Sequence, residues 1–192
     1  MKKSISYLLI YTLLVCGIVL SLTSLAFPDN KIEIIISDAS LIVPDNDSLS
    51  SRLLFKFDLP SSLSDKRIDF AEVVFYTKTD SSSTHSVMLA AYPVTTDWNK
   101  SSASWSNPWT NSGGDYNDSL CEIGLVKSSS EERIRLDITH FVERWQKQSM
   151  PNYGLIVFPV ETDRRIIGLV HPPGFAMNVY AKVIIYYSYT HP

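Results

Sequence analysis

The chain has 192 residues, a formal net charge of −3 at pH 7 and two cysteines, Cys16 and Cys121. This mild acidity argues against a nucleic-acid surface, which needs clustered lysine and arginine, so we expect no nucleic-acid partner. Cys16 lies in an N-terminal apolar run, which leaves one thiol in the globular part and no internal disulfide. We expect Cys121, flanked by apolar residues, to be a small buried side chain.

Residues 1–26 have the pattern of a secretory signal peptide. Two lysines precede a long apolar run, and Ser24-Leu25-Ala26 then matches a small-x-small cleavage site after Ala26. No charged residue occurs between Lys3 and Asp29, so the run is also long enough for an uncleaved membrane anchor. Both alternatives place residues 27–192 outside the cytoplasm, in the extracellular space or at the cell surface. Membrane contact is expected only through the uncleaved segment.

Alternation of apolar and polar residues predicts short β-strands along most of the remaining chain. The clearest is Arg52–Leu59, with apolar residues at every second position. Residues 68–79 and 87–94 flank a polar turn and are expected to pair as a hairpin. Further strands are predicted at 32–36, 41–43, 120–127, 134–138, 153–158, 163–170 and 178–189.

One short helix interrupts the strands, because the apolar period changes from two to 3.6 residues. The stripe is formed by Ile138, Phe141, Val142 and Trp145. The helix is predicted at about residues 138–149, with Asp137 or Thr139 as the cap and Pro151 beyond its end. A lone helix between apolar strands usually closes the open end of a β-sandwich, so we expect Trp145 in the core.

Nine or ten short strands with regular turns and one helix predict an all-β fold. We expect one antiparallel β-sandwich of the jelly-roll or Greek-key type, following the N-terminal signal or anchor helix. About 165 residues remain after the apolar run, enough for one domain with one substantial core.

Several segments of the sequence resemble DNRLRE-type domains. They are SRLLFKFDLPSSL with IDFAEVVFYT, then AYPVTTDWNKSSASWSNP, LDITHFVERWQKQSMPNYGLIVFP and AKVIIYYS. The resemblance spans roughly residues 41–189 and implies a single extracellular jelly-roll domain over 27–192. It also implies a relation to disaggregatase modules and non-catalytic carbohydrate-binding modules. Lys100 and Ser104 depart from the family pattern, and these departures concern its ligand more than its fold.

The long loop at residues 97–119 is the best candidate for a binding site, since irregular loops of this length are often functional. Indole rings can stack on the C–H face of a sugar, and polar neighbours can bind its hydroxyl groups. The candidate ligand residues are Trp109, Tyr116, Asn111 and Trp98. In the alternative, Trp98 and Trp105 are structural anchors that match landmarks of the resembled family. Trp109 and Tyr116 stay open between the two roles.

A metal site is predicted only as a weak calcium option. Its candidate ligands are Asp45, Asp47, Asp115 and Asp118, in loops that offer several oxygens. Turn formation explains the same residues equally well. The four histidines lack the spacing of zinc ligands, so no other cofactor is expected.

Three sequons, at Asn46, Asn99 and Asn117, lie in predicted loops and would accept glycans in a suitable host.

Together these observations predict a non-catalytic secreted or cell-surface module that binds polysaccharide of the cell envelope or extracellular matrix. No catalytic motif is present, and we assign no catalytic residue. One alternative is a structural or adhesive surface protein without a glycan site. Another is a polysaccharide-degrading enzyme. The sequence leaves the oligomeric state open.

Overall fold

The computed structural model describes residues 30–44, 50–79, 87–126, 132–160, 167–169 and 181–189. The expected signal or anchor segment, with its cleavage site at Ala26, lies outside these residues. Within the described ranges, no helix combines the length and apolar character needed to cross a membrane.

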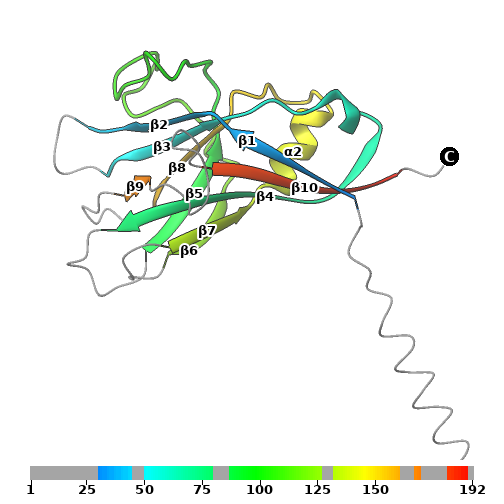
Figure 1. Cartoon of the computed structure of the whole chain (residues 1–192). Coiled ribbons are helices and arrows are strands. Elements are labelled where there is room, and N and C mark those ends of the chain that lie inside the picture. Colours follow the sequence, from blue (N-terminus) through cyan, green and yellow to red (C-terminus); the bar gives the residue numbers. More distant parts are fainter. Residues whose placement is uncertain are drawn as a thin grey trace, which may run out of the picture.

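Two antiparallel sheets pack face to face (Figure 1). The first has the order β1 (Lys31–Ile36), β10 (Ala181–Tyr189), β4 (Lys66–Thr79) and β7 (Glu132–Asp137), and β9 (Ile167–Leu169) also pairs with β4. The second has the order β2 (Asp38–Ile42), β3 (Arg52–Lys56), β8 (Leu155–Pro159), β5 (Val87–Pro93) and β6 (Glu122–Val126). A single 3-10 turn, η1 (Ser61–Leu63), precedes β4 in the described chain.

The strand order confirms the predicted jelly-roll sandwich. Strands distant in sequence lie side by side, β1 next to β10 and β3 next to β8, as two interlocking Greek keys require. The predicted hairpin of residues 68–79 with 87–94 is wrong, because β4 belongs to the first sheet and β5 to the second. A strand buries one face in the core whether the next strand pairs with it in a hairpin or belongs to the other sheet. The alternation of apolar and polar residues is therefore the same in both cases and cannot tell them apart.

The main core lies between the sheets and uses the inward-facing residues of both. Leu53 and Phe55 of β3 face Val73 and Phe75 of β4, and all four side chains are buried. The rings of Phe55 and Phe75 have centroids 5.1 Å apart. The strand alternation seen in the sequence therefore corresponds to this inner layer.

The helix α2 (Thr139–Gln146) is shorter than the predicted 138–149 but contributes its apolar stripe as expected. The N-cap residue is Ile138 and the helix has no side-chain cap, so the predicted cap by Asp137 or Thr139 is wrong. The backbone N–H of Thr139 donates instead to Oδ1 of Asp137, which lies one residue before the N-cap, at 2.9 Å. Trp145 is buried and meets the ring of Phe57 edge-on at 5.6 Å. Gln148 takes the left-handed conformation, φ 53°, and the helix ends before it.

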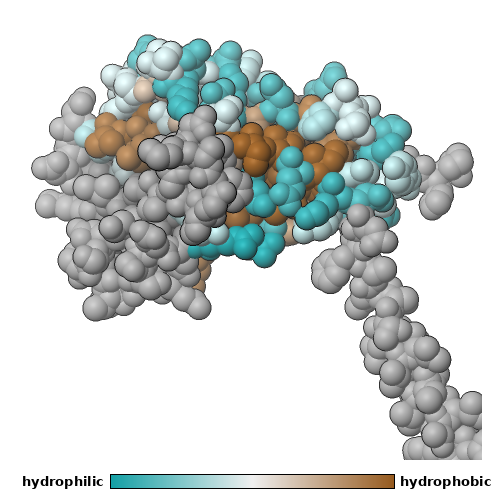
Figure 2. Space-filling model, viewed as in Figure 1, coloured by the Kyte–Doolittle hydropathy of each residue, from teal (hydrophilic) through white to brown (hydrophobic). Residues whose placement is uncertain are grey.

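Large apolar side chains are also exposed near the edges of the sandwich. Ile35 of β1, Leu41 of β2 and Val43 are at least one-third exposed. Figure 2 shows hydrophobic areas over the region of β2 and β3 and over that of β1 and β10. Isolated exposed aliphatic residues are common on protein surfaces and assign no function by themselves.

Candidate functional site

The segment from Val94 to Leu120 folds back over the outer face of the second sheet. Val94 forms a β-bridge with Tyr116, and the N–H of Asn117 donates to the carbonyl of Pro93 at 3.0 Å. A second apolar cluster lies beneath the segment, formed by Ile42, Leu54, Val94, Trp98, Trp109 and Ile156. The long loop is therefore a packed layer on the sheet.

Trp98 and Trp109 belong to this layer and are 4% and 7% exposed. Nε1 of Trp98 donates to the carbonyl of Tyr153 at 2.8 Å, and Nε1 of Trp109 to the carbonyl of Ser104 at 2.8 Å. A buried indole with a satisfied N–H offers no face to a ligand. We therefore correct the prediction that Trp98 and Trp109 contact a sugar: both anchor the loop.

Trp105, assigned in sequence to loop anchoring, is the tryptophan of this loop that stays partly exposed. Its ring lies 5.0 Å from Cζ of Arg52, and its carbonyl accepts the N–H of Gly113 at 2.6 Å. It therefore both anchors the loop and keeps part of its ring near the surface. The family resemblance favoured anchoring for Trp105 and left Trp109 open, but Trp109 is the more buried of the two.

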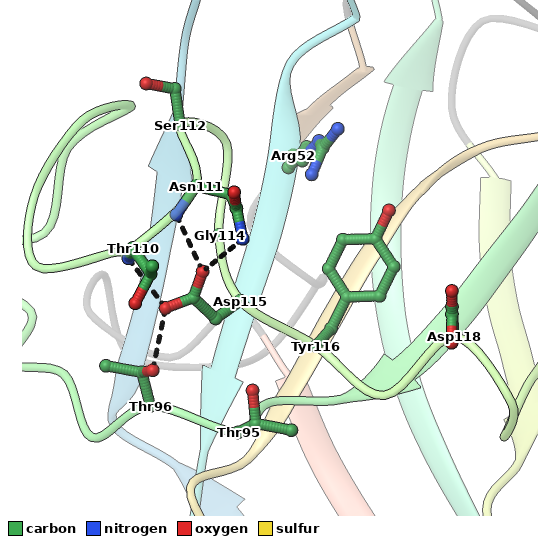
Figure 3. A pocket seen from close by; sticks show the side chains of 10 residues that line it. All are labelled: Arg52, Thr95, Thr96, Thr110, Asn111, Ser112, Gly114, Asp115, Tyr116 and Asp118. Carbon is green, nitrogen blue, oxygen red and sulfur yellow. Dashed lines mark hydrogen bonds between the residues drawn. The ribbon is translucent and has the colours of Figure 1, made fainter.

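A polar pocket of about 510 Å³ opens between β3 and the loop (Figure 3). It is lined by Arg52, Thr95, Thr96, Thr110, Asn111, Ser112, Gly114, Asp115, Tyr116 and Asp118. Two of the predicted ligand residues, Asn111 and Tyr116, come together here. Two of the calcium candidates, Asp115 and Asp118, line the same pocket. Several hydroxyl, amide and carboxylate groups thus converge on one opening.

Arg52 forms one wall of the pocket and was missed by sequence reasoning. It begins β3 on the outer face, where a charged residue on an alternating strand reads as ordinary surface. Its Cζ lies 4.4 Å from the ring centroid of Phe158 and 5.6 Å from that of Tyr116. Burial lowers the pKa of Arg52, but an arginine stays charged in proteins. No described carboxylate forms an ion pair with it.

The pair Gly113-Gly114 lets the loop approach the sheet this closely. Both residues have positive φ angles, 95° and 108°, a conformation that residues with a Cβ atom rarely adopt. A Cβ on Gly113 would lie 3.0 Å from Cζ of Arg52, and one on Gly114 would lie 2.7 Å from Cδ1 of Ile156. Glycine is therefore required here by both conformation and space.

Asp115 holds the far side of the pocket. Its carboxylate accepts hydrogen bonds from Oγ1 of Thr96 at 2.8 Å and from the backbone N–H groups of Thr110 and Asn111 at 2.7 and 2.9 Å. Burial acts to raise the pKa of Asp115, but these hydrogen bonds outweigh it, so the pKa is lowered. The side chain thus has the turn-forming role that was the alternative to metal binding.

Three half-buried rings, Tyr92, Tyr116 and Phe158, pack together beside Arg52. The Tyr92 and Phe158 rings stack with centroids 5.1 Å apart. Burial, followed by interaction with Cys121, raises the pKa of Tyr92 to about 12. The phenol of Tyr92 is therefore neutral at physiological pH and adds no charge to the site.

Cys121 itself is exposed, contrary to the expectation that it is buried. It directly precedes β6, which ends the second sheet on one side. Ile123 and Leu125 on the same strand are also about 60% exposed. Apolar neighbours in sequence predicted burial, but a strand at the end of a sheet leaves its outward side chains uncovered.

No group of three or more His, Cys, Asp or Glu residues in the described parts of the chain has a metal-binding arrangement. Asp45 and Asp47 lie outside those parts, so the calcium option stays a prediction.

Of the three sequons, Asn46 lies outside the described residues. Asn99 and Asn117 are in the loop, and each side-chain oxygen accepts the N–H of the residue two positions later, Ser101 and Ser119, at 2.9 and 3.1 Å. Both lie in a loop, as predicted, and their use stays a prediction.

Comparison with known families matches residues 37–166 to the model of carbohydrate-binding module family 96. This span covers more than half of the chain and includes every residue that lines the pocket. The chain therefore belongs to carbohydrate-binding module family 96. Such families are generally non-catalytic. No curated protein matches the chain.

Proposed function

We propose that this member of carbohydrate-binding module family 96 binds polysaccharide through the pocket between β3 and the loop, without cleaving it. The observation that carries the proposal is the convergence of Arg52, Asn111 and Tyr116 on one polar opening within the matched residues. Guanidinium, amide and hydroxyl groups are the partners that sugar hydroxyls need, since each hydroxyl both donates and accepts.

The pocket supplies both kinds of contact that a sugar ring uses. Nη1 of Arg52 donates to the carbonyl of Gly113 at 2.7 Å, and the other N–H groups of Arg52 can donate to a ligand. Asn111, Thr95 and Asp118 add further donors and acceptors at the rim. Outside the pocket lining, the half-buried Trp105 beside Arg52 adds an apolar side chain for the C–H face of a sugar.

A preformed surface of this kind limits the entropic cost of binding. Arg52 is held over aromatic rings and by the hydrogen bond to Gly113, so its guanidinium plane has one orientation before the ligand arrives. The polar groups then form hydrogen bonds with sugar hydroxyls in place of water. Because each such exchange contributes only about 0.5–1.5 kcal/mol, affinity depends on several contacts made together.

The carboxylates of the pocket support a binding role. Glycoside hydrolysis needs a carboxylic acid with a raised pKa opposite a second carboxylate. The pKa of Asp115 is lowered, and its oxygens accept hydrogen bonds from within the loop. Asp118 is the other carboxylate of the pocket lining. The lowered pKa of Asp115 does not suit the carboxylic acid of such a couple.

We further propose that residues 27–192 form one exported domain of the DNRLRE type, at the cell surface or in the extracellular space. The N-terminal lysines, apolar run and small-x-small site support export. The ligand would then be polysaccharide of the cell envelope or extracellular matrix. A protease-protection assay on intact expressing cells tests the location, and a domain degraded only after lysis would contradict it.

The binding proposal is tested by affinity electrophoresis of the purified protein in gels that contain neutral or acidic polysaccharides. We expect at least one polysaccharide to retard the protein, and Arg52→Ala to abolish the retardation while its thermal unfolding stays cooperative. Absence of retardation by every polysaccharide would overturn the proposal and favour a structural or adhesive role. Sustained release of reducing sugar would contradict the non-catalytic assignment.

A further inference from the structure

Asp115 makes the densest set of hydrogen bonds in the pocket. Oδ2 accepts from Oγ1 of Thr96 at 2.8 Å and from N–H of Thr110 at 2.7 Å. Oδ1 accepts from N–H of Asn111 at 2.9 Å and lies 3.5 Å from Nδ2 of the same residue. The backbone carbonyl of Asp115 also accepts the N–H of Thr95 at 3.0 Å.

These contacts join two limbs of the loop that are distant in sequence. Thr95 and Thr96 follow β5 after Val94, whereas Thr110 and Asn111 lie on the returning limb, and both limbs line the pocket. Asp115 thus holds the two limbs together on one side of the pocket. Charge-assisted hydrogen bonds from backbone N–H groups to a carboxylate are about twice as strong as neutral ones, so this arrangement is well defined.

The same contacts orient the side chain of Asn111. Its Nδ2 faces Asp115, and its Oδ1 points away from that carboxylate (Figure 3). Asn111 therefore presents a hydrogen-bond acceptor to a sugar hydroxyl. Both oxygens of Asp115 are already occupied by donors within the loop. Asp118 lies at the other end of the pocket, and the hydroxyl of Ser119, at 3.5 Å, is its only hydrogen-bond donor among the described residues.

We propose that Asp115 is a positioning residue of the polysaccharide site, which acts by holding Thr96, Thr110 and Asn111 in the binding geometry and does not contact the ligand. This inference rests on the proposed function. It gives the two carboxylates of the pocket different roles, because Asp118 contacts the ligand whereas Asp115 holds the residues that do.

The test measures the affinity for polysaccharide together with the NMR signals of the backbone amides that Asp115 is proposed to position. Asp115→Asn replaces one acceptor oxygen by an NH₂ group that cannot accept from the facing N–H groups. Thr96→Val removes one donor at similar volume, and Thr96→Ser restores it. Asp58→Asn, at an exposed position between β3 and η1, is the matched control. Each purified variant is titrated with the polysaccharide that retards the wild type most, and the amide resonances of Thr110 and Asn111 are followed by NMR.

We expect Asp115→Asn to weaken binding at least about tenfold, because a hydrogen-bonded charged group is lost. The amide signals of Thr110 and Asn111 should shift upfield and exchange faster. Thr96→Val should weaken binding less, and Thr96→Ser should restore it. The double variant Asp115→Asn with Thr96→Val should bind within about twofold of Asp115→Asn alone, since the two groups act through one hydrogen bond.

The outcomes separate this inference from the proposed function. If the wild type binds and Asp115→Asn binds equally well, Asp115 is not a positioning residue, although the polysaccharide site stands. If Asp115→Asn loses affinity while both amide signals keep their positions, Asp115 contacts the ligand directly, which also overturns the inference. If the wild type binds no polysaccharide, the proposed function fails and the inference fails with it.

Discussion

Arg52 donates from Nη1 to the backbone carbonyl of Gly113, 61 residues later in the chain, at 2.7 Å. The bond ties the first residue of β3 to the point where the long loop turns back toward the sheet. Because Gly113 has no side chain, the guanidinium reaches the carbonyl without a clash. The same residue that anchors the loop thus forms a wall of the pocket, so loop packing and ligand contact are coupled at Arg52.

Replacing Arg52 by lysine should weaken polysaccharide binding about tenfold, because an ammonium group lacks the planar donors of the guanidinium. The positive charge is kept, so a purely electrostatic role would leave the affinity unchanged. Isothermal titration with the bound polysaccharide measures the difference. Arg67→Lys, an exposed arginine on the first sheet, is the matched control and should bind like the wild type.

Trp145→Ala and Trp109→Ala should both destabilise the fold, each by about 3–5 kcal/mol, because both indoles are buried and a cavity would remain. The sequence placed Trp145 in the core and left the role of Trp109 open between ligand contact and structure, and the burial of Trp109 favours the structural role. Urea denaturation followed by fluorescence gives both free energies of unfolding. A loss below about 1 kcal/mol for Trp109→Ala would show that the loop layer unfolds separately from the core.

Gly154→Ala should be among the most disruptive small substitutions in the chain. Gly154 precedes β8 with φ 87°, and a Cβ there would lie 2.0 Å from the carbonyl oxygen of Phe55. Neither backbone can move without breaking the pairing of β3 with β8, so we expect several kcal/mol of destabilisation. Thermal unfolding and soluble yield measure it. Wild-type stability of the variant would contradict the close approach of the two strands.

Raising the pH should destabilise the protein over the pH range between the pKa of Tyr92 in the unfolded chain and its raised pKa in the folded protein. Its pKa is raised from 10.0 to about 12, first by burial. The unfolded state therefore loses its proton first, and the stability contributed by neutral Tyr92 is complete below pH 10 and is lost as the pH approaches 12. Tyr92→Phe should flatten this slope in urea titrations between pH 9 and pH 12. An unchanged slope would show that other groups govern alkaline unfolding.

The sequence by itself determined the periodic features of the fold. Alternation in Arg52–Leu59 marked an inward face that the structure buries, and the stripe through Phe141 and Trp145 marked the helix that packs in the same core. Such patterns arise because each strand or helix must bury one face against something, whichever element that is. For the same reason the chain could be recognised as one antiparallel sandwich with a single short helix between two of its strands.

Only the tertiary structure decided which elements face one another. It placed β4 and β5 in different sheets, buried Trp109 while leaving Trp105 partly exposed, and brought Arg52 to Gly113. The type of a residue indicates whether its side chain tends to be buried, but it does not indicate which distant segment covers that side chain. The site depends on contacts between β3 and a loop about 60 residues later, and no local period in the sequence encodes such a contact.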